Sequence, residues 1–299
     1  MNLLEIADLS ADQIDDILGL ARRPIAELGR PLEGQGAALI FEKPSTRTRH
    51  STEMAVVQLG GHPVYTRGDE IGMDVRESVE DIVRILEGYH RVIAARVYDH
   101  RVLERMAEVA SVPIVNLLSD RAHPLQALAD ALTMERAFGP LAGRRVAWVG
   151  DYNNVARSLG EVTARLGGHV AYACPPGFEP SRAELERLLL LGAPSAEHHW
   201  RPADAVKGAD AVHADTWVSM GQEEEKAARV QAFEGFTVDE ALMGHAAPGA
   251  VFMHCLPAYR DLEVTADVID GPRSRVFEQG HDRLHAARGA LAFLVERTS

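Results

Sequence analysis

Short apolar runs and helical patterns alternate along the chain in two successive series. In the first series the apolar runs predict strands at residues 37–41, 62–66, 91–97 and 113–118. The helical patterns beside them predict helices at 10–28, from within 45–49 to about 59, and at 78–87, 101–109 and 123–138. The second series predicts strands at 145–150, 169–174, 210–215 and 250–255, and helices at 155–166, 181–191 and 282–295. Strands that alternate with helices indicate parallel sheets with helices on both faces.

The two series are separated by a break at residues 139–143, which contain Gly139, Pro140 and Gly143. We therefore expect two domains, with residues 1–138 in the first and residues 139–281 in the second. The predicted fold class is α/β, with two doubly wound parallel-sheet domains. Six polar loops follow strands in these series, and open parallel sheets bind ligands at the carboxyl ends of their strands. These loops predict one interdomain active-site cleft.

Composition narrows the possible functions. The 299 residues carry a net charge of −13, which disfavours nucleic acids and anionic membranes as partners. No stretch reaches the roughly 18 apolar residues that a membrane-spanning helix needs, and the N-terminus lacks a basic lead. The only two cysteines, Cys174 and Cys255, lie far apart and form no paired motif. We expect a cytoplasmic protein that needs no disulfide framework.

The segment Ser45-Thr46-Arg47-Thr48-Arg49 lies between a predicted strand and a helix that starts within it. Free backbone N–H groups at a helix N-terminus favour an anion, and hydroxyl side chains add further donors. Arg47 can hold two phosphate oxygens through its planar guanidinium group. Capping of the helix by Ser45 or Thr46 explains part of the pattern equally well, and the two roles are compatible. The segment predicts an anion site.

Four further motifs follow this segment in order: a lone Arg96 at a strand end, His123-Pro-Leu-Gln126, Asp215-Thr-Trp-Val-Ser-Met-Gly221 and His254-Cys-Leu-Pro257. With STRTR they make essentially the whole chain resemble the aspartate and ornithine carbamoyltransferase superfamily. The resemblance implies an enzyme that uses carbamoyl phosphate, and its DxWxSMG loop is similar to that of the ornithine branch. It also implies that the last helix, 282–299, completes the first domain.

The resemblance assigns roles residue by residue. It implies that Thr48, Arg96 and His123 bind the carbonyl oxygen, where donors stabilise the charge that develops in the reaction. Gln126 and the backbone carbonyl of Leu256 would bind the carbamoyl NH2 group. The implied carbamoyl-phosphate residues are Ser45, Thr46, Arg47, Thr48, Arg96, His123, Gln126, Cys255, Leu256 and Arg283.

For ornithine the resemblance implies Asn154, Asp215, Ser219 and Met220, with Cys255 beside the amine. Since neighbours in a strand point to opposite faces, we expect His254 not to activate Cys255 as a nucleophile. A structural role as a small buried residue is the alternative for Cys255. The segment GDYNN lacks the glycines of a pyrophosphate site, so we expect no nicotinamide; we expect no other cofactor and no metal.

Taken together, these patterns predict transfer of a carbamoyl group from carbamoyl phosphate to L-ornithine, with L-citrulline and phosphate as products. A sibling enzyme that uses putrescine, an N-acylated ornithine or aspartate is the first alternative, and a non-catalytic phosphate-binding relative is the second. The loop 68–78 departs from the superfamily, since it lacks the glutamine, or the serine and lysine, that reach a neighbouring subunit's site. Arg76 or Ser78 could substitute. The resemblance implies a homotrimer, or a multiple of one, and a role in arginine biosynthesis.

Overall fold

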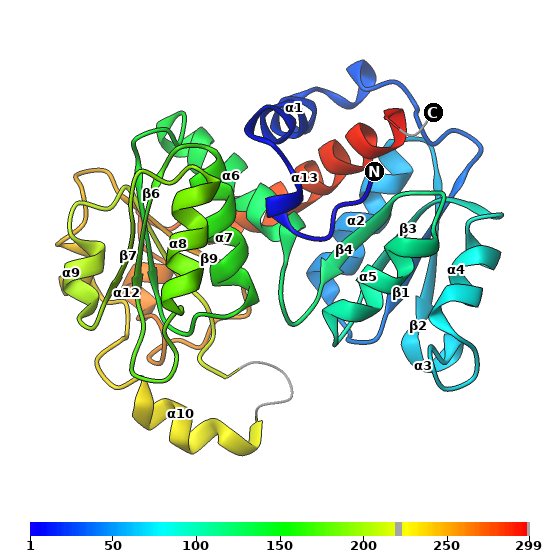
Figure 1. Ribbon diagram of the computed structural model, residues 1–299. Helices are drawn as coiled ribbons and strands as arrows, with labels where there is room; N and C mark the ends of the chain where they lie inside the picture. The colour runs from blue at the N-terminus through cyan, green and yellow to red at the C-terminus, as the bar shows by residue number, and fades with distance from the viewer. Residues whose placement is uncertain (219–222, 298–299) are drawn as a thin grey trace. The chain divides into compact units, whose positions relative to one another are not determined.

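The computed structural model describes residues 1–218 and 223–297. These residues form two compact units. The first unit is Met1–Ala129 together with the segment that begins at Asp282, and the second is Asp130–His281. Figure 1 shows that each unit consists of a sheet flanked by helices. The unit boundaries fall within two long helices, α6 (Pro124–Phe138) and α13 (Val276–Glu296).

The first unit contains a four-stranded parallel sheet in the order β2-β1-β3-β4. Its strands are β1 (Gly36–Phe41), β2 (His62–Arg67), β3 (His90–Arg96) and β4 (Ile114–Leu118). Its helices, besides the parts of α6 and α13, are α1 (Ala11–Arg22), α2 (Thr46–Gln58), α3 (Gly68–Ile71), α4 (Val79–Leu86) and α5 (His100–Val109), with short 3-10 turns at Ile6–Asp8 and Ile25–Glu27.

Helices cover both faces of this sheet. Helices α4 and α5 pack on one face, where Ile82, Val83, Leu103 and Met106 meet strand residues such as Ile93 in a buried apolar cluster. Helix α13 packs closely on α1. A Cβ added at Gly289 of α13 would approach the carbonyl oxygen of Ile17 to 2.5 Å, so glycine permits the two backbones to approach each other here. The C-terminal segment is therefore an integral part of the first unit.

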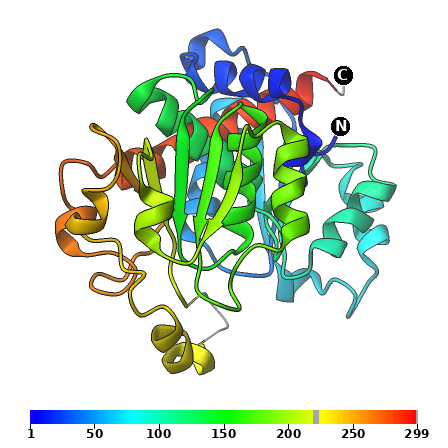
Figure 2. The same cartoon turned by 60° about the vertical axis from the view of Figure 1, so that its left-hand side comes forward.

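The second unit contains a five-stranded parallel sheet in the order β7-β6-β5-β8-β9. Its strands are β5 (Arg145–Val149), β6 (His169–Ala173), β7 (Ala196–His199), β8 (Ala211–Ala214) and β9 (Val251–His254). Its helices are α7 (Asn154–Arg165), α8 (Arg182–Leu191), α9 (Pro202–Val206), α10 (Lys226–Ala232), α11 (Glu240–Met243) and α12 (Ala266–Ile269), with a 3-10 turn at Glu223–Glu225. Figure 2 shows the strands of this sheet side by side.

Each sheet has one point at which the strand order reverses. In the first sheet the chain moves from β1 outward to β2, then returns to the other side of β1 to form β3. In the second sheet it moves from β5 outward through β6 and β7, then returns to the other side of β5 to form β8. In doubly wound folds ligands bind outside the carboxyl ends of the two strands at this reversal. The fold thus directs attention to the loops after β1 and β3, and to those after β5 and β8.

The predicted fold class is confirmed, since both sheets are parallel and flanked by helices. Several elements differ from the prediction, among them the unpredicted short helices α3, α9, α11 and α12, of which α3 lies in the expected loop 68–78. Helix α1 ends at Arg22 rather than near residue 28, because Pro24 forces the preceding Arg23 into an extended conformation. Strand β7 was not predicted, since its sequence Ala-Glu-His-His has no apolar run. Helix α13 begins at Val276, six residues before the predicted start at 282.

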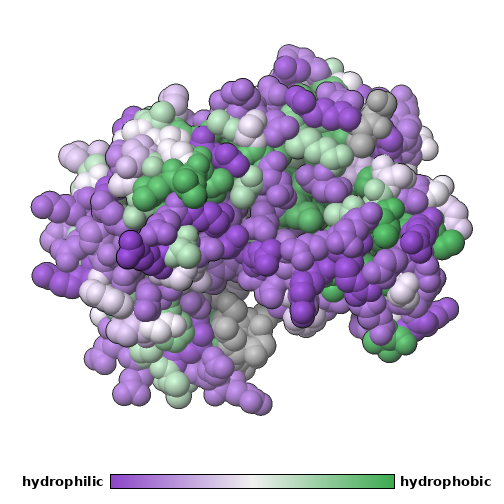
Figure 3. Space-filling view, viewed as in Figure 1, coloured by the Kyte–Doolittle hydropathy of each residue, from purple (hydrophilic) through white to green (hydrophobic). Residues whose placement is uncertain are grey.

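Polar side chains dominate the face of the molecule shown in Figure 3, and apolar side chains form only small clusters on it. Among the described residues, no helix is both long enough and apolar enough to span a membrane.

Candidate functional site

The N-terminus of α2 contains the predicted anion site. Ser45 is the N-cap residue, and its hydroxyl accepts a hydrogen bond from the Thr48 backbone N–H at 3.3 Å. The cap leaves other N–H groups of the first turn directed toward any anion at this helix end. Thr46 is exposed and Arg47 is half-buried. Ser45 therefore caps the helix, which is the alternative role that the sequence indicated. The cap lies in the same turn that could bind phosphate.

Arg283 connects the separate motifs of the first unit. Its guanidinium group donates to the Thr48 hydroxyl at 2.7 Å and to the Gln126 side-chain oxygen, and it lies 3.3 Å from Nε2 of His123. All four side chains are at least nine-tenths buried. The structure thus places together four of the predicted residues, which lie as far as 235 positions apart in the sequence.

His123 is held in its neutral form. Burial lowers its pKa well below 6.5, and the positive charges of Arg283 and Arg96 lower it further. An arginine N–H can only donate, so Nε2 accepts from Arg283 and the ring proton lies on Nδ1. A neutral imidazole close to two arginines adds no third positive charge to this part of the unit.

Arg96 is the last residue of β3, and only 6% of it is exposed. It lies close enough to His123 and to Lys43 to affect the pKa of both. Lys43 was not singled out from the sequence, although it lies two residues before Ser45. Partial burial and Arg96 lower the Lys43 pKa, and its ammonium lies 4.1 Å from the centre of the Tyr98 ring. The loops after β1 and β3 are therefore rich in cations and suited to an anion.

In the second unit, Asp215 directly follows β8 and is 8% exposed. Its carboxylate accepts hydrogen bonds from three donors: the Asn153 side chain at 2.9 Å, the Thr216 backbone N–H at 2.8 Å and the Cys255 thiol at 3.2 Å. Asn153 also caps α7, because its side-chain oxygen accepts from the backbone N–H groups of residues 155 and 156. Asp215 is thus a preorganised negative charge at the reversal point of the second sheet.

Cys255 lies just beyond the end of β9, so the alternation of strand side chains no longer applies to it. One ligand atom each from Asp215, His254 and Cys255 lies within 4.8 Å of the others, which is closer than we expected for His254. The thiol donates to Asp215, whereas Nδ1 of His254 accepts from the Leu256 backbone N–H at 2.9 Å. A nitrogen, a sulfur and a carboxylate oxygen at this spacing could also coordinate a zinc-like ion.

The backbone of the HCLP segment is held by buried side chains. Leu256 has a φ of 57°, a left-handed conformation that is uncommon for leucine and is often found at functional sites. Its N–H is fixed by His254, and the ring of His254 lies 3.4 Å from the buried carboxylate of Glu263. The His254 backbone N–H donates to Gln279 at 2.9 Å. Glu263 and Gln279 were not predicted, because no local motif marks them.

The remaining predicted residues lie in the second unit. Asn154 is the first residue of α7 and is half-buried, next to the capping Asn153. Ser219 and Met220 lie outside the described residues. Asp151 and Arg229 also form an ion pair in this unit, in which Arg229 is buried and Asp151 is partly buried. Asp151 belongs to the GDYNN segment and could have been suspected, whereas Arg229 has no recognisable motif around it.

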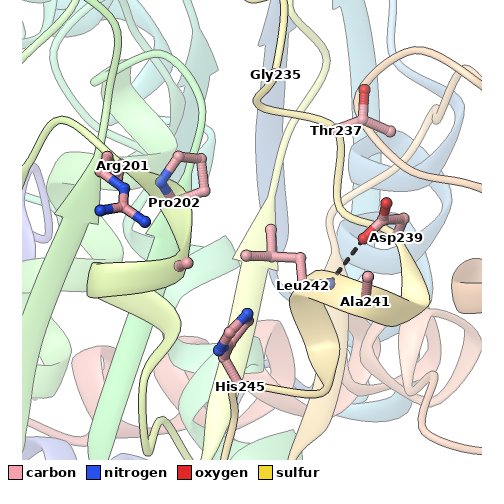
Figure 4. A pocket seen from close by; sticks show the side chains of 9 residues that line it. Arg201, Pro202, Gly235, Thr237, Asp239, Ala241, Leu242 and His245 are labelled. Atoms are coloured by element: carbon pink, nitrogen blue, oxygen red, sulfur yellow. Dashed lines mark hydrogen bonds between the residues drawn. The ribbon is translucent and has the colours of Figure 1, made fainter.

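A separate hollow in the second unit contains none of the predicted residues. It is lined by Arg201, Thr237, Asp239, Leu242 and His245, among others (Figure 4). Asp239 is the N-cap of α11 and accepts from the Leu242 backbone N–H at 2.7 Å, so its carboxylate already has a structural partner. We assign no chemistry to this hollow.

Two family models match the chain and together cover nearly all of it. Residues 1–136 match the carbamoyl-P binding domain of aspartate/ornithine carbamoyltransferase. Residues 142–294 match the Asp/Orn binding domain of the same family. The cation-rich loops of the first unit and the Asp215 site of the second fall within these two matches.

Individual relatives match over almost their full length. An ornithine carbamoyltransferase from Thermus thermophilus is 46% identical over 297 residues, covering 99% of this chain and 97% of the relative. The solved structure of ornithine carbamoyltransferase from Pyrococcus furiosus has a TM-score of 0.93 at 42% identity, covering 99% and 97% of the two chains. A variant of N-acetyl-L-ornithine transcarbamylase has a TM-score of 0.87 at 29% identity, covering 98% and 99%. The shared fold therefore extends to relatives with different amine substrates in their names.

Proposed function

Because the chain belongs to the aspartate/ornithine carbamoyltransferase family, we propose that it transfers the carbamoyl group of carbamoyl phosphate to L-ornithine. The products are L-citrulline and phosphate. The observation that carries the choice of amine is Asp215, a carboxylate held by three donors at the carboxyl end of β8. A fixed carboxylate is the partner that an α-ammonium group requires, and ornithine offers one.

In this proposal the first unit binds carbamoyl phosphate. The N-terminal turn of α2, with Ser45, Thr46 and Arg47, binds the phosphate group, whose charge is favoured at a helix N-terminus. Thr48, Arg96 and His123 donate to the carbonyl oxygen, which gains negative charge as the amine attacks. Arg283 holds Thr48, His123 and Gln126 in place and adds positive charge near the phosphate. Gln126 and the Leu256 carbonyl bind the carbamoyl NH2 group.

The amine attacks the carbonyl carbon directly. A C–N bond forms, a tetrahedral intermediate follows, and the C–O bond to phosphate then breaks with phosphate as the leaving group. The side-chain amine of ornithine should resemble lysine, with a pKa near about 10.4, so a proton must leave before attack. One proton of the ammonium leaves to solvent before attack, and the phosphate takes up the second as it departs, without a covalent intermediate on sulfur. Cys255 lies beside the amine in this proposal, with its thiol donating to Asp215 at 3.2 Å. Asn154, Ser219 and Met220 complete the binding of the amino acid.

The experiment compares four amines in one assay. Purified protein with carbamoyl phosphate receives ornithine, putrescine, N-acetylornithine or aspartate, and the carbamoylated product and released phosphate are both measured. We expect kcat/KM for ornithine to exceed that of each other amine at least about 100-fold, because putrescine lacks the α-carboxylate and N-acetylornithine lacks the α-ammonium. Preference for another amine identifies a sibling transferase. If none of the four amines gives a carbamoylated product and released phosphate, the proposal is contradicted.

We further propose that the enzyme is a homotrimer, or a multiple of one, in the cytoplasm, and that it serves arginine biosynthesis. Two cysteines without a disulfide suit a reducing compartment. Met54, Val57 and Val64 are exposed apolar residues on α2 and the edge strand β2, and they suit a contact with a second copy. Light scattering of the purified protein tests the trimer, and a monomer at micromolar concentration contradicts it.

A further inference from the structure

Arg229 contacts three other segments of the second unit. It lies on α10, the yellow helix in Figure 1, and is 6% exposed. Its guanidinium group donates to the Asp151 carboxylate, and its Nε donates to the Trp217 backbone carbonyl at 2.5 Å. Its planar face lies 4.8 Å from the Phe178 ring centre. The group is therefore enclosed by partners and is held in one orientation.

These contacts join the two loops that carry the amine site. Asp151 follows β5, and Trp217 lies two residues after Asp215, which follows β8. Asn153, two residues after Asp151, donates to Asp215 at 2.9 Å. The chain of contacts is closed: Asp215 to Asn153, along the backbone to Asp151, across to Arg229, and through Trp217 back to Asp215. We call this set of five residues the Arg229 ring.

The Arg229 ring also sets the local charge. Asp151 and Asp215 are two carboxylates close enough for the charge of Asp215 to raise the pKa of Asp151, although burial contributes most to that rise. Arg229 forms an ion pair with the Asp151 carboxylate and also lies 3.7 Å from the largely exposed carboxylate of Glu225. Within the ring it compensates one of the two negative charges. One net negative charge remains among the three side chains, which matches the single α-ammonium of the proposed substrate.

We propose that Arg229 is a positioning residue for amine binding: by joining Asp151 to the Trp217 carbonyl, it holds the Asp215 carboxylate in place and leaves it as the uncompensated charge of the Arg229 ring. The identity of the amine in this inference rests on the proposed function, whereas the contacts of Arg229 do not. Arg229 acts through Asp215 and does not itself contact the amine. Its loss should weaken binding of the amine far more than binding of carbamoyl phosphate.

The amino ends of the same two strands, β5 and β8, provide a control residue. Arg144 and Asp210 immediately precede β5 and β8, and their side chains pair at 2.9 Å. Arg144 also donates to a backbone carbonyl, that of Phe138, at 2.9 Å, and lies 5.2 Å from the Phe138 ring. Arg144 therefore makes the same three kinds of contact (carboxylate, backbone carbonyl and aromatic ring) at the amino ends of β5 and β8, where no ligand is expected, although its side chain is more exposed than that of Arg229. A purely structural role predicts that loss of either arginine lowers stability without a selective change in KM for the amine.

The test uses the full-length protein and the variants Arg229→Met, Arg229→Lys and Arg144→Met. Methionine fits between aromatic rings, so Arg229→Met removes the charge while preserving apolar contact. For each variant, KM for ornithine, KM for carbamoyl phosphate, kcat and the melting temperature are measured. In Arg229→Met we expect KM for ornithine to rise about 10- to 100-fold, as for a lost hydrogen bond to a charged group, and KM for carbamoyl phosphate to change less than about 3-fold.

Arg229→Lys should give an intermediate rise, since one ammonium cannot reproduce the fixed geometry of the two donations. This variant retains the buried charge and tests the proposal if Arg229→Met does not fold. Arg144→Met should lower the melting temperature but leave both KM values within about 2-fold of the parent.

A double variant, Arg229→Met with Asp151→Asn, separates positioning from charge. It restores the net charge and removes the unpaired carboxylate, so we expect the melting temperature to recover while KM for ornithine stays high. Recovery of KM in the double variant, equal changes in both KM values, or the same KM change in Arg144→Met would overturn the proposal. If the parent uses another amino acid in place of ornithine, the proposed function fails. The change in KM for that amino acid, compared with the change in KM for carbamoyl phosphate in Arg229→Met, still decides the role of Arg229.

Discussion

The two units place opposite charges at corresponding points of their sheets. At the reversal point of the first sheet, Arg96 and Arg283 lie beside His123, and Arg96 also lies close to Lys43. At the reversal point of the second, the loops after β5 and β8 bring together Asp151 and Asp215, with Arg229 as the only partner cation among the described side chains of this set. The same topology thus provides a site suited to an anion in the first unit and a site suited to a cation in the second.

The two sites also differ in how they are held. The first begins with a helix N-terminus whose residues are contiguous, from Ser45 to Arg49, and whose cap is local. The second is held by contacts between distant segments, such as Asn153 with Asp215 and Arg229 with Asp151. The anion-binding turn of the first site depends mainly on its local sequence, although Arg283 joins that turn to His123 and Gln126, whereas the second site depends entirely on contacts between distant segments.

The largest effect is expected from Arg96→Met, which removes a cation from the first site. If Arg96 donates to the developing negative charge on the carbonyl oxygen, its loss costs about 2.7–4 kcal/mol of transition-state stabilisation and lowers kcat about 100- to 1000-fold. Steady-state kinetics measure this effect. The control is Arg91→Met, which removes an arginine from the other end of the same strand β3. A kcat within 5-fold of the parent would exclude Arg96 from the reaction.

Asp215→Asn removes the charge of the second site and should raise KM for ornithine about 10- to 100-fold, because a charge-assisted contact to the ammonium is lost. KM for carbamoyl phosphate should change much less, since no residue assigned to the phosphate lies in this loop. Asp210→Asn, at the other end of β8, is the control. Equal changes in the KM values of the two substrates would mean that the two sites do not divide the substrates as proposed.

The neutral His123 makes the first unit sensitive to acid. The folded pKa of His123 lies well below 6.5, whereas the unfolded chain takes up this proton near pH 6.5, so protonation favours the unfolded chain. The stability that goes with a neutral His123 is fully present above about pH 6.5. Below that pH the free energy of unfolding falls, by as much as about 1.4 kcal/mol per pH unit. Urea unfolding from pH 7.5 to 5 should show a shallower loss for His123→Asn than for the parent. His90 and His100, whose pKa values burial also lowers, contribute equally to both proteins. Parallel curves for the two proteins would mean that His123 titrates normally.

The smallest effect is expected from Cys255→Ala. The thiol donates to a carboxylate that keeps two other donors, so we expect kcat/KM for ornithine to fall less than about 10-fold. In the parent, incubation with carbamoyl phosphate alone should leave Cys255 without a carbamoyl adduct by mass spectrometry. Detection of an adduct that ornithine then removes would establish a covalent route and would reverse the assignment of this residue.

Local sequence determined much of the first site. An apolar run followed by STRTR specifies a buried strand, a turn and a capped helix, because hydrophobic burial and the Ser45 cap act within a few residues. The parallel sheets followed from alternating strand and helix patterns for the same reason. Polar residues at strand ends, such as Arg96 and Asp215, were also visible, since their position relative to a strand is a local property.

Only the tertiary structure decided which distant side chains meet. Arg283 contacts Thr48, and Arg229 contacts Asp151, across separations that no periodicity encodes. Strand β7, with its half-buried Ala-Glu-His-His, forms because Val170 to Ala173 of β6 provide backbone partners, so its sequence needs no apolar run. Cys255 and His254 lie close together because the strand ends between them. In each case the deciding energy comes from partners brought near by the fold, and a buried charge such as Arg229 is stable only where those partners already surround it.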